Sequence, residues 1–242
     1  MAITQESRVV VLGGTSGIGL ATAKAAAAAG ASVVVASRNP ASVEAALAQL
    51  PAGSQGHVVD VSSAEGREDF FTAVGTFDHF AYTAAENIAS VPLKDYTTEK
   101  GSSFLALRLI AALDAIRLAV PNIRPGGSIT MTSGTAAFRG GEGWLLGATA
   151  SGATISAAKS LAVELAPIPI RVNVVAPGMA RSPLWAQVPE VEREAMYENA
   201  GGSIPLGRVA EVEDVAKAYV QLMDQDYVTG TVSVIDGGAI LV

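Results

Sequence analysis

Residues 9–19 read VVVLGGTSGIG, an apolar run that passes directly into a glycine-rich turn. The run predicts a buried strand, and the Ala-rich segment that follows the glycines predicts a helix. Gly13 permits a tight bend, while Gly17 and Gly19 remove side chains where a phosphate and the neighbouring backbone come close. The helix would present free N–H groups and the positive end of its dipole to that phosphate. Placed between a strand and a helix, the turn predicts a dinucleotide site rather than a small-residue turn without a ligand.

Short strands and longer helices alternate along the rest of the chain. Several strands are apolar almost throughout, as in a parallel sheet covered on both faces, and Asn39 followed by Pro40 is typical of a helix start. This order indicates right-handed βαβ units. We therefore predict an α/β fold: a single doubly wound, Rossmann-type domain, residues 1–242, with a parallel sheet flanked by helices. The predicted strands are Val9–Leu12, Ser32–Ala36, His57–Val61, Phe77–Tyr82, Ser128–Thr132, Arg171–Val175 and Thr231–Ile235, and the predicted helices span about 17–29, 40–50, 63–74, 97–119, 145–166 and 211–223.

The segment from Met179 to Ser203 breaks this alternation. It follows the sixth strand at the carboxyl end of the sheet, where open α/β sheets bind ligands, and we expect it to be a substrate lid. Its apolar and aromatic residues suggest an apolar or aromatic small-molecule substrate, although such residues also pack lids onto cores. They are Met179, Leu184, Trp185, Met196 and Tyr197.

The second strand ends at Ser37 and Arg38 with no carboxylate nearby. An NAD site usually offers a carboxylate at this point for the ribose 2′-hydroxyl. A guanidinium can instead pair with a 2′-phosphate through charge-assisted hydrogen bonds. The sequence therefore favours NADP(H) over NAD(H), the alternative being a solvated loop arginine.

Composition excludes several other classes of function. The net charge is −7 without a basic run, which argues against nucleic-acid binding. The chain has no cysteine and only two histidines, His57 and His79, so neither disulfides nor a zinc site are expected. The amino terminus does not resemble a signal peptide, and no apolar run reaches the ~20 residues of a membrane span. We expect a cytoplasmic protein.

The landmarks together resemble the short-chain dehydrogenase/reductase family, in the family's order and from residue 9 to 238. They are Gly13-x-x-x-Gly17-Ile18-Gly19, Asp60-Val61, Asn173-Val174-Val175-Ala176-Pro177-Gly178, Pro205-Leu206-Gly207-Arg208 and Asp236-Gly237-Gly238. The resemblance implies a seven-stranded sheet, a homotetramer or homodimer, an adenine contact from Asp60 and Val61, and a nicotinamide flanked by Pro177 and the residues after it. The cofactor site expected from the residues and the resemblance comprises Gly13, Thr15, Ser16, Gly17, Ile18, Gly19, Ser37, Arg38, Asp60, Val61, Thr83, Ala84, Ala85, Pro177, Gly178, Met179, Ala180 and Ser182.

The family's catalytic pair is missing. The resemblance implies catalysis by a Tyr that transfers a proton and a Lys, four residues later, that lowers the pKa of the Tyr. It also implies a Ser that holds the substrate oxygen and an Asn that takes part in a water relay. Counting back from residues 160–164 places the Tyr position at Gly147 and the Lys position at Ser151, and no Tyr occurs between Tyr96 and Tyr197.

Two residues are candidates for the remaining catalysis. Ser133 matches the substrate-binding Ser, unless Gly134 aligns there and Ser133 only forms a turn at the strand end. Lys100, or with one residue of slip Glu99, takes the position of the Asn. A cation there could face a developing oxyanion, although an exposed lysine is more common. Tyr82 could supply a phenol but is more often core filling.

The sequence thus predicts an NADP(H)-dependent oxidoreductase that acts on a carbonyl or alcohol with non-standard catalytic residues. Two alternatives stay open: a non-catalytic NADP(H)-binding sensor or scaffold, and a non-redox enzyme built on the same pocket. The helix that has lost the catalytic pair is rich in Gly, Ala and Ser, which suits close helix packing between subunits of a homo-oligomer.

Overall fold

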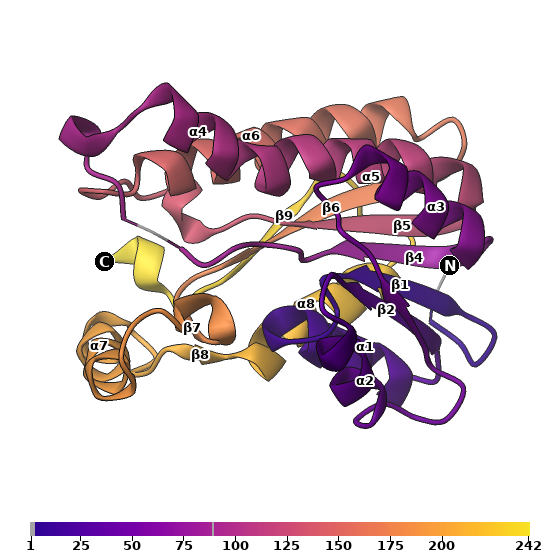
Figure 1. Ribbon diagram of the computed structural model, residues 1–242, viewed down its shortest axis with the longest axis horizontal. Coiled ribbons are helices and arrows are strands. Elements are labelled where there is room, and N and C mark those ends of the chain that lie inside the picture. Colours follow the sequence, from indigo (N-terminus) through magenta and orange to yellow (C-terminus); the bar gives the residue numbers. More distant parts are fainter. Residues whose placement is uncertain (1–2, 89) are drawn as a thin grey trace.

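Seven parallel strands form one sheet in the computed structural model, which describes residues 3–88 and 90–242 (Figure 1). The sheet has the order β3-β2-β1-β4-β5-β6-β9, and each neighbouring pair is parallel. The prediction of a seven-stranded, doubly wound α/β sheet is confirmed. The chain runs outward from β1 in one direction and from β4 in the other, which opens a crevice between their carboxyl ends. The strands are β1 (Arg8–Leu12), β2 (Ser32–Ser37), β3 (Gln55–Val58), β4 (Phe77–Tyr82), β5 (Ile123–Thr132), β6 (Arg171–Pro177) and β9 (Val232–Ile235).

Helices cover both faces of the sheet (Figure 1). One layer contains α3 (Ala64–Val74), α4 (Thr98–Leu105), α5 (Ala111–Ala119) and α6 (Leu145–Glu164), and the other contains α1 (Gly17–Ala28), α2 (Pro40–Leu47) and α8 (Val212–Asp224). The helix predicted over 97–119 is divided, because a π-helical turn at Ala106–Ile110 separates α4 from α5. Within residues 3–88 and 90–242, no helix has the length and apolarity needed to cross a membrane.

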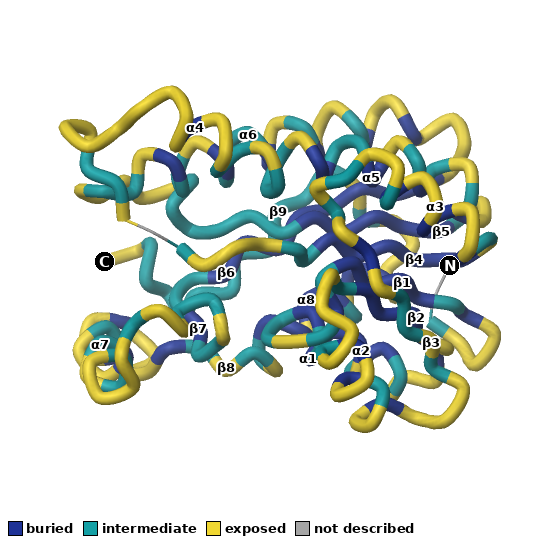
Figure 2. The backbone as a smooth tube through the Cα atoms, viewed as in Figure 1, coloured by how far each residue is buried: buried dark blue, intermediate teal, exposed yellow. Residues whose placement is uncertain are grey.

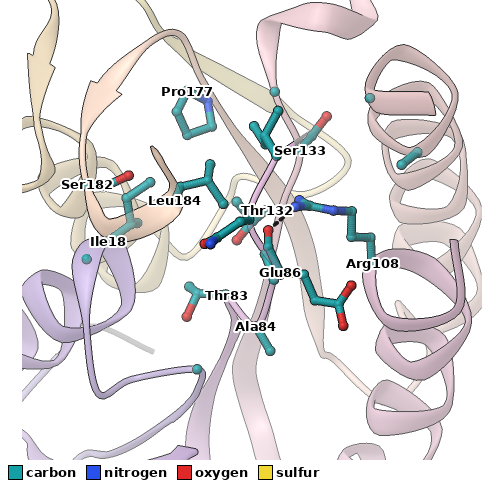
Figure 3. A pocket seen from close by; sticks show the side chains of 18 of the residues that line it. Ile18, Thr83, Ala84, Glu86, Arg108, Thr132, Ser133, Pro177, Ser182 and Leu184 are labelled. Atoms are coloured by element: carbon teal, nitrogen blue, oxygen red, sulfur yellow. Dashed lines mark hydrogen bonds between the residues drawn. The ribbon is translucent and has the colours of Figure 1, made fainter. Parts of the chain in front are cut away.

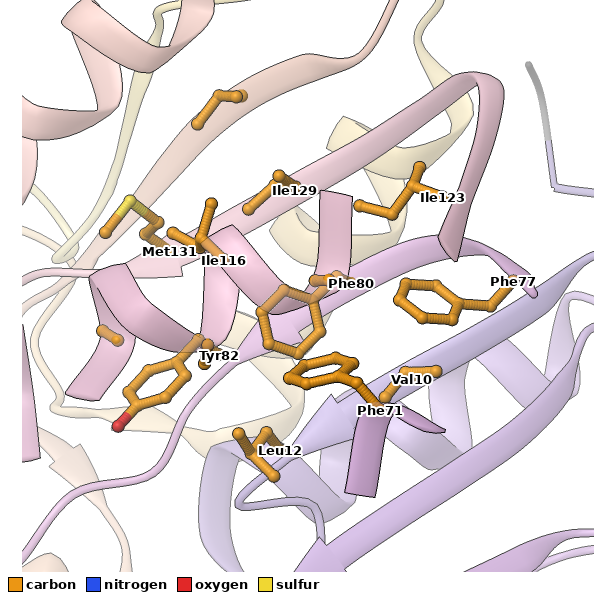
Figure 4. Close-up of a cluster of buried hydrophobic side chains, with 14 of the residues drawn as sticks. Val10, Leu12, Phe71, Phe77, Phe80, Tyr82, Ile116, Ile123, Ile129 and Met131 are labelled. Atoms are coloured by element: carbon orange, nitrogen blue, oxygen red, sulfur yellow. The ribbon is translucent and has the colours of Figure 1, made fainter. Parts of the chain in front are cut away.

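The strands lie in the interior, and the exposed residues lie on the outer turns of the helices and loops (Figure 2). All four residues from Val9 to Leu12 are fully buried. On the α3–α5–α6 face, the rings of Phe71 and Phe80 meet edge to face at 5.5 Å between centroids (Figure 4). Such aromatic contacts add to the burial of apolar area. The apolar runs of the sequence are therefore the core of the fold.

The third strand ends earlier than predicted. It covers Gln55–Val58 rather than His57–Val61, so Asp60 and Val61 lie in the turn beyond it. The reason is an Asx-type turn, because Oδ1 of Asp60 accepts hydrogen bonds from the Ser62 N–H (2.9 Å) and hydroxyl (2.7 Å).

The expected lid is not a long loop. It contains the short strand β7 (Ala180–Arg181), paired with β8 (Ala210–Glu211), then a 3₁₀ turn at Pro183–Trp185 and the helix α7 (Glu190–Ser203). Tyr197 on α7 is buried against Ile204 and Val209, with Met196 packed beside them. Met196 and Tyr197 thus pack this segment onto its own small core and do not line the cavity, so for these two residues the structure favours the packing alternative over substrate contact.

His79 of β4 makes the stability dependent on pH. Its ring is fully buried; Nδ1 lies 2.9 Å from the Ser128 hydroxyl, and Nε2 has no hydrogen-bond partner among the described residues. Burial, reinforced by Arg171 and opposed by Asp78, lowers the pKa of His79 from 6.5 to about 4. As the pH falls below about 6.5, the imidazole of His79 therefore binds a proton in the unfolded chain but stays neutral in the folded chain. The contribution of neutral His79 to the free energy of unfolding is therefore fully present above that pH and is lost as the pH falls toward 4.

We expect the free energy of unfolding to fall by roughly 2 kcal/mol through His79 alone between pH 7.5 and pH 5. Urea titrations at the two pH values measure this change, and His79→Gln should remove most of it. The matched control is His57→Gln, because His57 is only half-buried, although burial lowers its pKa as well. An unchanged pH dependence in His79→Gln would contradict the assignment.

Candidate functional site

A cavity of about 660 Å³ opens at the carboxyl ends of β1, β4, β5 and β6. Figure 3 shows its wall, with Ile18, Ser182 and Leu184 facing the ends of β4 and β5. Every residue predicted for the cofactor site lines this cavity. They are Gly13, Thr15, Ser16, Gly17, Ile18, Gly19, Ser37, Arg38, Asp60, Val61, Thr83, Ala84, Ala85, Pro177, Gly178, Met179, Ala180 and Ser182. The fold thus brings together residues that are far apart in the sequence.

The glycine turn packs tightly against the end of β4. Gly13 has a φ of +91°, and a Cβ there would lie 2.5 Å from the backbone nitrogen of Ala84. A Cβ on Gly19 would lie 2.2 Å from the carbonyl oxygen of Gly13 and 2.4 Å from the hydroxyl of Thr83. Packing within the protein therefore requires glycine at positions 13 and 19, so these two glycines are not by themselves proof of a ligand.

The amino end of α1 is open toward the cavity. Ser16 precedes the helix, and its side chain makes no capping hydrogen bond within the described part of the chain. The first N–H groups of a helix have no intrahelical partner, and the helix dipole favours an anion there. Gly17 faces Pro183, because a Cβ on it would lie 3.3 Å from Cδ of that proline. The turn, the helix end and the 3₁₀ turn at Pro183–Trp185 thus enclose a space that fits a phosphate.

Arg38 lies exposed at the cavity wall beyond β2, near the Asp60 turn. Hydrogen bonds from Ser62 hold the pKa of Asp60 below its usual value, and the Arg38 and Arg67 charges contribute further. In the ranges 3–88 and 90–242, Arg38 forms no ion pair within 4.0 Å. Its guanidinium is therefore available to an anionic group bound in this part of the cavity.

The positions assigned to the family's Tyr and Lys lie beside Ser133. The hydroxyl of Ser133 donates to the backbone carbonyl of Ser151 at 2.9 Å, and Gly147, one turn earlier on α6, also lines the cavity. A Cβ on Gly147 would lie 3.3 Å from the ring of Trp144. The indole of Trp144 therefore crowds the place where a side chain at position 147 would begin.

Lys100 lies away from this site. It is exposed, does not line the cavity, and its Nζ donates to the carbonyl oxygen of Asp95 at 2.8 Å. Glu99, the neighbouring alternative, is also exposed and outside the lining. This geometry corrects the expectation of a catalytic Lys100, because its position in the pocket depended on the family's spacing, and the first turn of α4 faces solvent.

Tyr82 lines the inner end of the cavity, but its hydroxyl is already engaged. It donates to the carbonyl of Leu107 at 2.7 Å, and burial raises the pKa of the phenol above its usual value. Its ring packs in the buried hydrophobic cluster with Leu12 and Met131 (Figure 4). Core filling with a satisfied hydroxyl is therefore the interpretation that the structure favours.

Several other side chains that line the cavity were not singled out from the sequence. Arg108 extends from the π-helical turn into the cavity (Figure 3). Trp144 meets Trp185 edge to face, with 6.2 Å between ring centroids. Phe104 and Arg139 also contribute to the wall. Only Trp185 carried a signal in the sequence, because it lies in the segment that breaks the alternation.

Comparison with known proteins agrees with this architecture. Residues 13–239 match the family model described as enoyl-(acyl carrier protein) reductase. The chain is 37% identical to the short-chain dehydrogenase/reductase ATR9 of Stachybotrys chlorohalonatus over 248 residues, 96% of each protein. It is 30% identical to the short-chain dehydrogenase/reductase malC of Malbranchea aurantiaca over 265 residues, 100% of both.

Solved structures give the same result. A small-chain dehydrogenase in complex with NADPH superposes with a TM-score of 0.86 at 31% identity, covering 98% of this chain and 100% of the other. The MalC reductase/Diels-Alderase of Malbranchea aurantiaca superposes with a TM-score of 0.89 at 28% identity, covering 98% and 97%. The chain therefore belongs to the short-chain dehydrogenase/reductase family of oxidoreductases.

Proposed function

We propose that the protein is an NADP(H)-dependent oxidoreductase that acts on a carbonyl or alcohol with a non-standard set of catalytic residues. The observation that carries the proposal is that three features line one cavity: the glycine turn at the amino end of α1, Arg38, which forms no ion pair with the described residues, and Ser133. The NADPH complex of a structural relative supports the same cofactor.

The residues of the cavity divide between the parts of the dinucleotide. The turn from Gly13 to Gly19 and the amino end of α1 would hold the pyrophosphate, and Arg38 would pair with the 2′-phosphate. Asp60 and Val61 would contact the adenine, and the residues from Pro177 to Ser182 would flank the nicotinamide. When bound, the cofactor supplies or accepts the hydride.

The chain's own contribution is orientation and exclusion of water. Ser133 would hold the substrate oxygen, because its hydroxyl can turn from the Ser151 carbonyl toward a ligand. Trp144, Leu184 and Trp185 form an apolar wall next to it. We propose that residues 179–203 act as the lid of this single domain, through the 3₁₀ turn rather than through α7. Positioning in a dry site can supply much of a rate even without a strong general acid.

Selectivity for NADPH over NADH tests the proposal. We expect the native protein to bind NADPH roughly 10- to 100-fold more tightly, the range for a charge-assisted contact, and Arg38→Ala to lose most of the difference. Calorimetric titration with both dinucleotides measures the ratio. Arg139→Ala is the matched control, since Arg139 also lines the cavity. Equal binding of NADPH and NADH by the native protein would refute the cofactor assignment.

A non-redox reaction in the same cavity is a second candidate. It is favoured by Gly147 and Ser151, which carry no acid–base group at the positions assigned to the family's Tyr and Lys, and by a relative that is named both a reductase and a Diels-Alderase. If the protein converts a substrate while the NADPH concentration stays constant, the result would favour the non-redox reaction. Stoichiometric oxidation of NADPH would favour the first.

We also propose that the chain forms a homo-oligomer. Much of α6 consists of Gly, Ala and Ser, and its Val163 side chain is 77% exposed. Small side chains let helices approach closely, and a second α6 would cover such a surface.

A further inference from the structure

Arg108 is a cation aimed into the substrate end of the cavity. It lies in the middle of the π-helical turn Ala106–Ile110, and its guanidinium reaches across the opening toward the segment after β4 (Figure 3). There it donates to the carbonyl oxygen of Glu86 and stacks on the ring of Phe104 at 4.6 Å. Turns of π-helix inside α-helices occur often at functional sites.

The charge of Arg108 has no carboxylate partner among residues 3–88 and 90–242. No acidic oxygen lies within 4.0 Å of it in the part of the chain that the structure describes, because the Glu86 contact is made by the backbone. Burial lowers the pKa of the guanidinium, while the more distant Glu86 carboxylate and Tyr82 oppose this effect. A half-buried cation with spare N–H donors is costly unless an anion completes it.

The other cations among the described residues of the cavity are assigned to the cofactor or bound to the backbone. Among the described lining residues these are Arg38, at the cofactor end, and Arg139. Arg139 donates to the backbone carbonyls of Ala239 and Val242, which ties the last turn of the chain to the cavity wall. Arg108 is therefore the cation left for a second ligand.

Aromatic side chains line the cavity that Arg108 enters. Phe104 lies under the guanidinium, and the Trp144–Trp185 pair forms another part of the same cavity. A flat apolar body fits such walls. A planar guanidinium pairs with a carboxylate through two parallel hydrogen bonds. With one available cation, the site suits a single negative charge better than a phosphate dianion.

We propose that Arg108 binds the carboxylate of an aromatic substrate. This assignment deepens the proposed function and rests on it, since it places the acid in the half of the cavity next to the expected nicotinamide. The negative charge would neutralise Arg108, the rings would hold the aromatic body, and Ser133 would remain free for the reacting oxygen.

Calorimetry on the NADP⁺-loaded protein tests the proposal with naphthoate and its neutral counterpart naphthamide. We expect naphthoate to bind at least about tenfold more tightly. Arg108→Gln and Arg108→Leu should lose this preference, whereas Arg108→Lys should retain part of it. The control Arg139→Leu should keep the preference. Titration with NADP⁺ beforehand shows that each variant is folded and loaded.

Three kinds of outcome would overturn the assignment of Arg108. Equal affinities for the two probes, or no binding of either, would show that the cavity does not recognise a carboxylate. Loss of the preference in Arg139→Leu but not in Arg108→Leu would place the anion at Arg139. A comparable loss of NADP⁺ affinity in Arg108→Gln would make Arg108 a cofactor residue. Failure of the native protein to bind NADP⁺ would instead refute the proposed function, and a naphthoate preference measured without NADP⁺ would still support Arg108.

Discussion

Replacing Gly13 with alanine should destabilise the protein by roughly 3–5 kcal/mol and abolish NADPH binding. Two costs combine at this residue. Its φ of +91° is strained for any residue with a Cβ, and that Cβ would lie 2.5 Å from the nitrogen and 2.7 Å from the Cα of Ala84. Both neighbours are backbone atoms, so no side-chain rotation can relieve the contact. Urea unfolding and a calorimetric NADPH titration measure the two effects.

Gly202→Ala is the matched control. Gly202 lies exposed near the end of α7, outside the left-handed region, and a Cβ on it would have nothing within 4 Å. The substitution should be neutral or stabilise by up to about 1 kcal/mol, because alanine loses less backbone entropy in a helix. A Gly13→Ala protein as stable as the native one would show that the turn is not as tight as the structure indicates.

Introducing the family's catalytic pair should raise ketone-reductase turnover by roughly 10²–10⁴-fold, the usual contribution of general acid–base catalysis. The variant is Gly147→Tyr combined with Ser151→Lys. The two positions are one helical turn apart on α6, both line the cavity, and Ser133 donates to the Ser151 carbonyl beside them. A phenol at 147 and an ammonium at 151 would therefore project toward the substrate oxygen that we propose Ser133 holds.

The experiment needs two companion variants. A Cβ at position 147 would lie 3.3 Å from the Trp144 ring, so the pair is best introduced with and without Trp144→Ala. Gly147→Phe with Ser151→Lys supplies the same ring without the hydroxyl, and it should leave turnover at the native level. NADPH oxidation is followed in a screen of ketones, quinones and aldehydes. If NADPH binding is intact and turnover does not rise in either background, positions 147 and 151 have been wrongly assigned.

The sequence predicted the features that depend on local pattern. The apolar run at Val9–Leu12 is fully buried, and β4 covers Phe77–Tyr82 as expected from its composition. The glycine turn and the residues at the strand ends line one cavity because parallel strands deliver their carboxyl ends to the same edge. Their nature as a cofactor site remains a prediction.

Other features depend on tertiary context that no local pattern carries. The π-helical turn shifts the phase of the helix that follows it, so periodicity alone could not show that Arg108 faces the cavity. The helix α7 carries two glycines near its end and many charges, and this composition gave no helical signal within the expected lid. Lys100 was placed by the spacing of a family motif, whereas the structure turns it toward Asp95.

The tryptophan pair has a spectroscopic consequence. The chain contains two tryptophans, and both Trp144 and Trp185 belong to the wall of the cavity. The intrinsic indole fluorescence of the whole protein therefore originates at its ligand site rather than being averaged over distant parts of the core. Reduced nicotinamide absorbs where indole emits, so energy transfer from these rings would report occupancy of the cofactor half. An aromatic ligand packed against this tryptophan pair would quench the emission directly, and the two events could be separated in one titration without any attached dye.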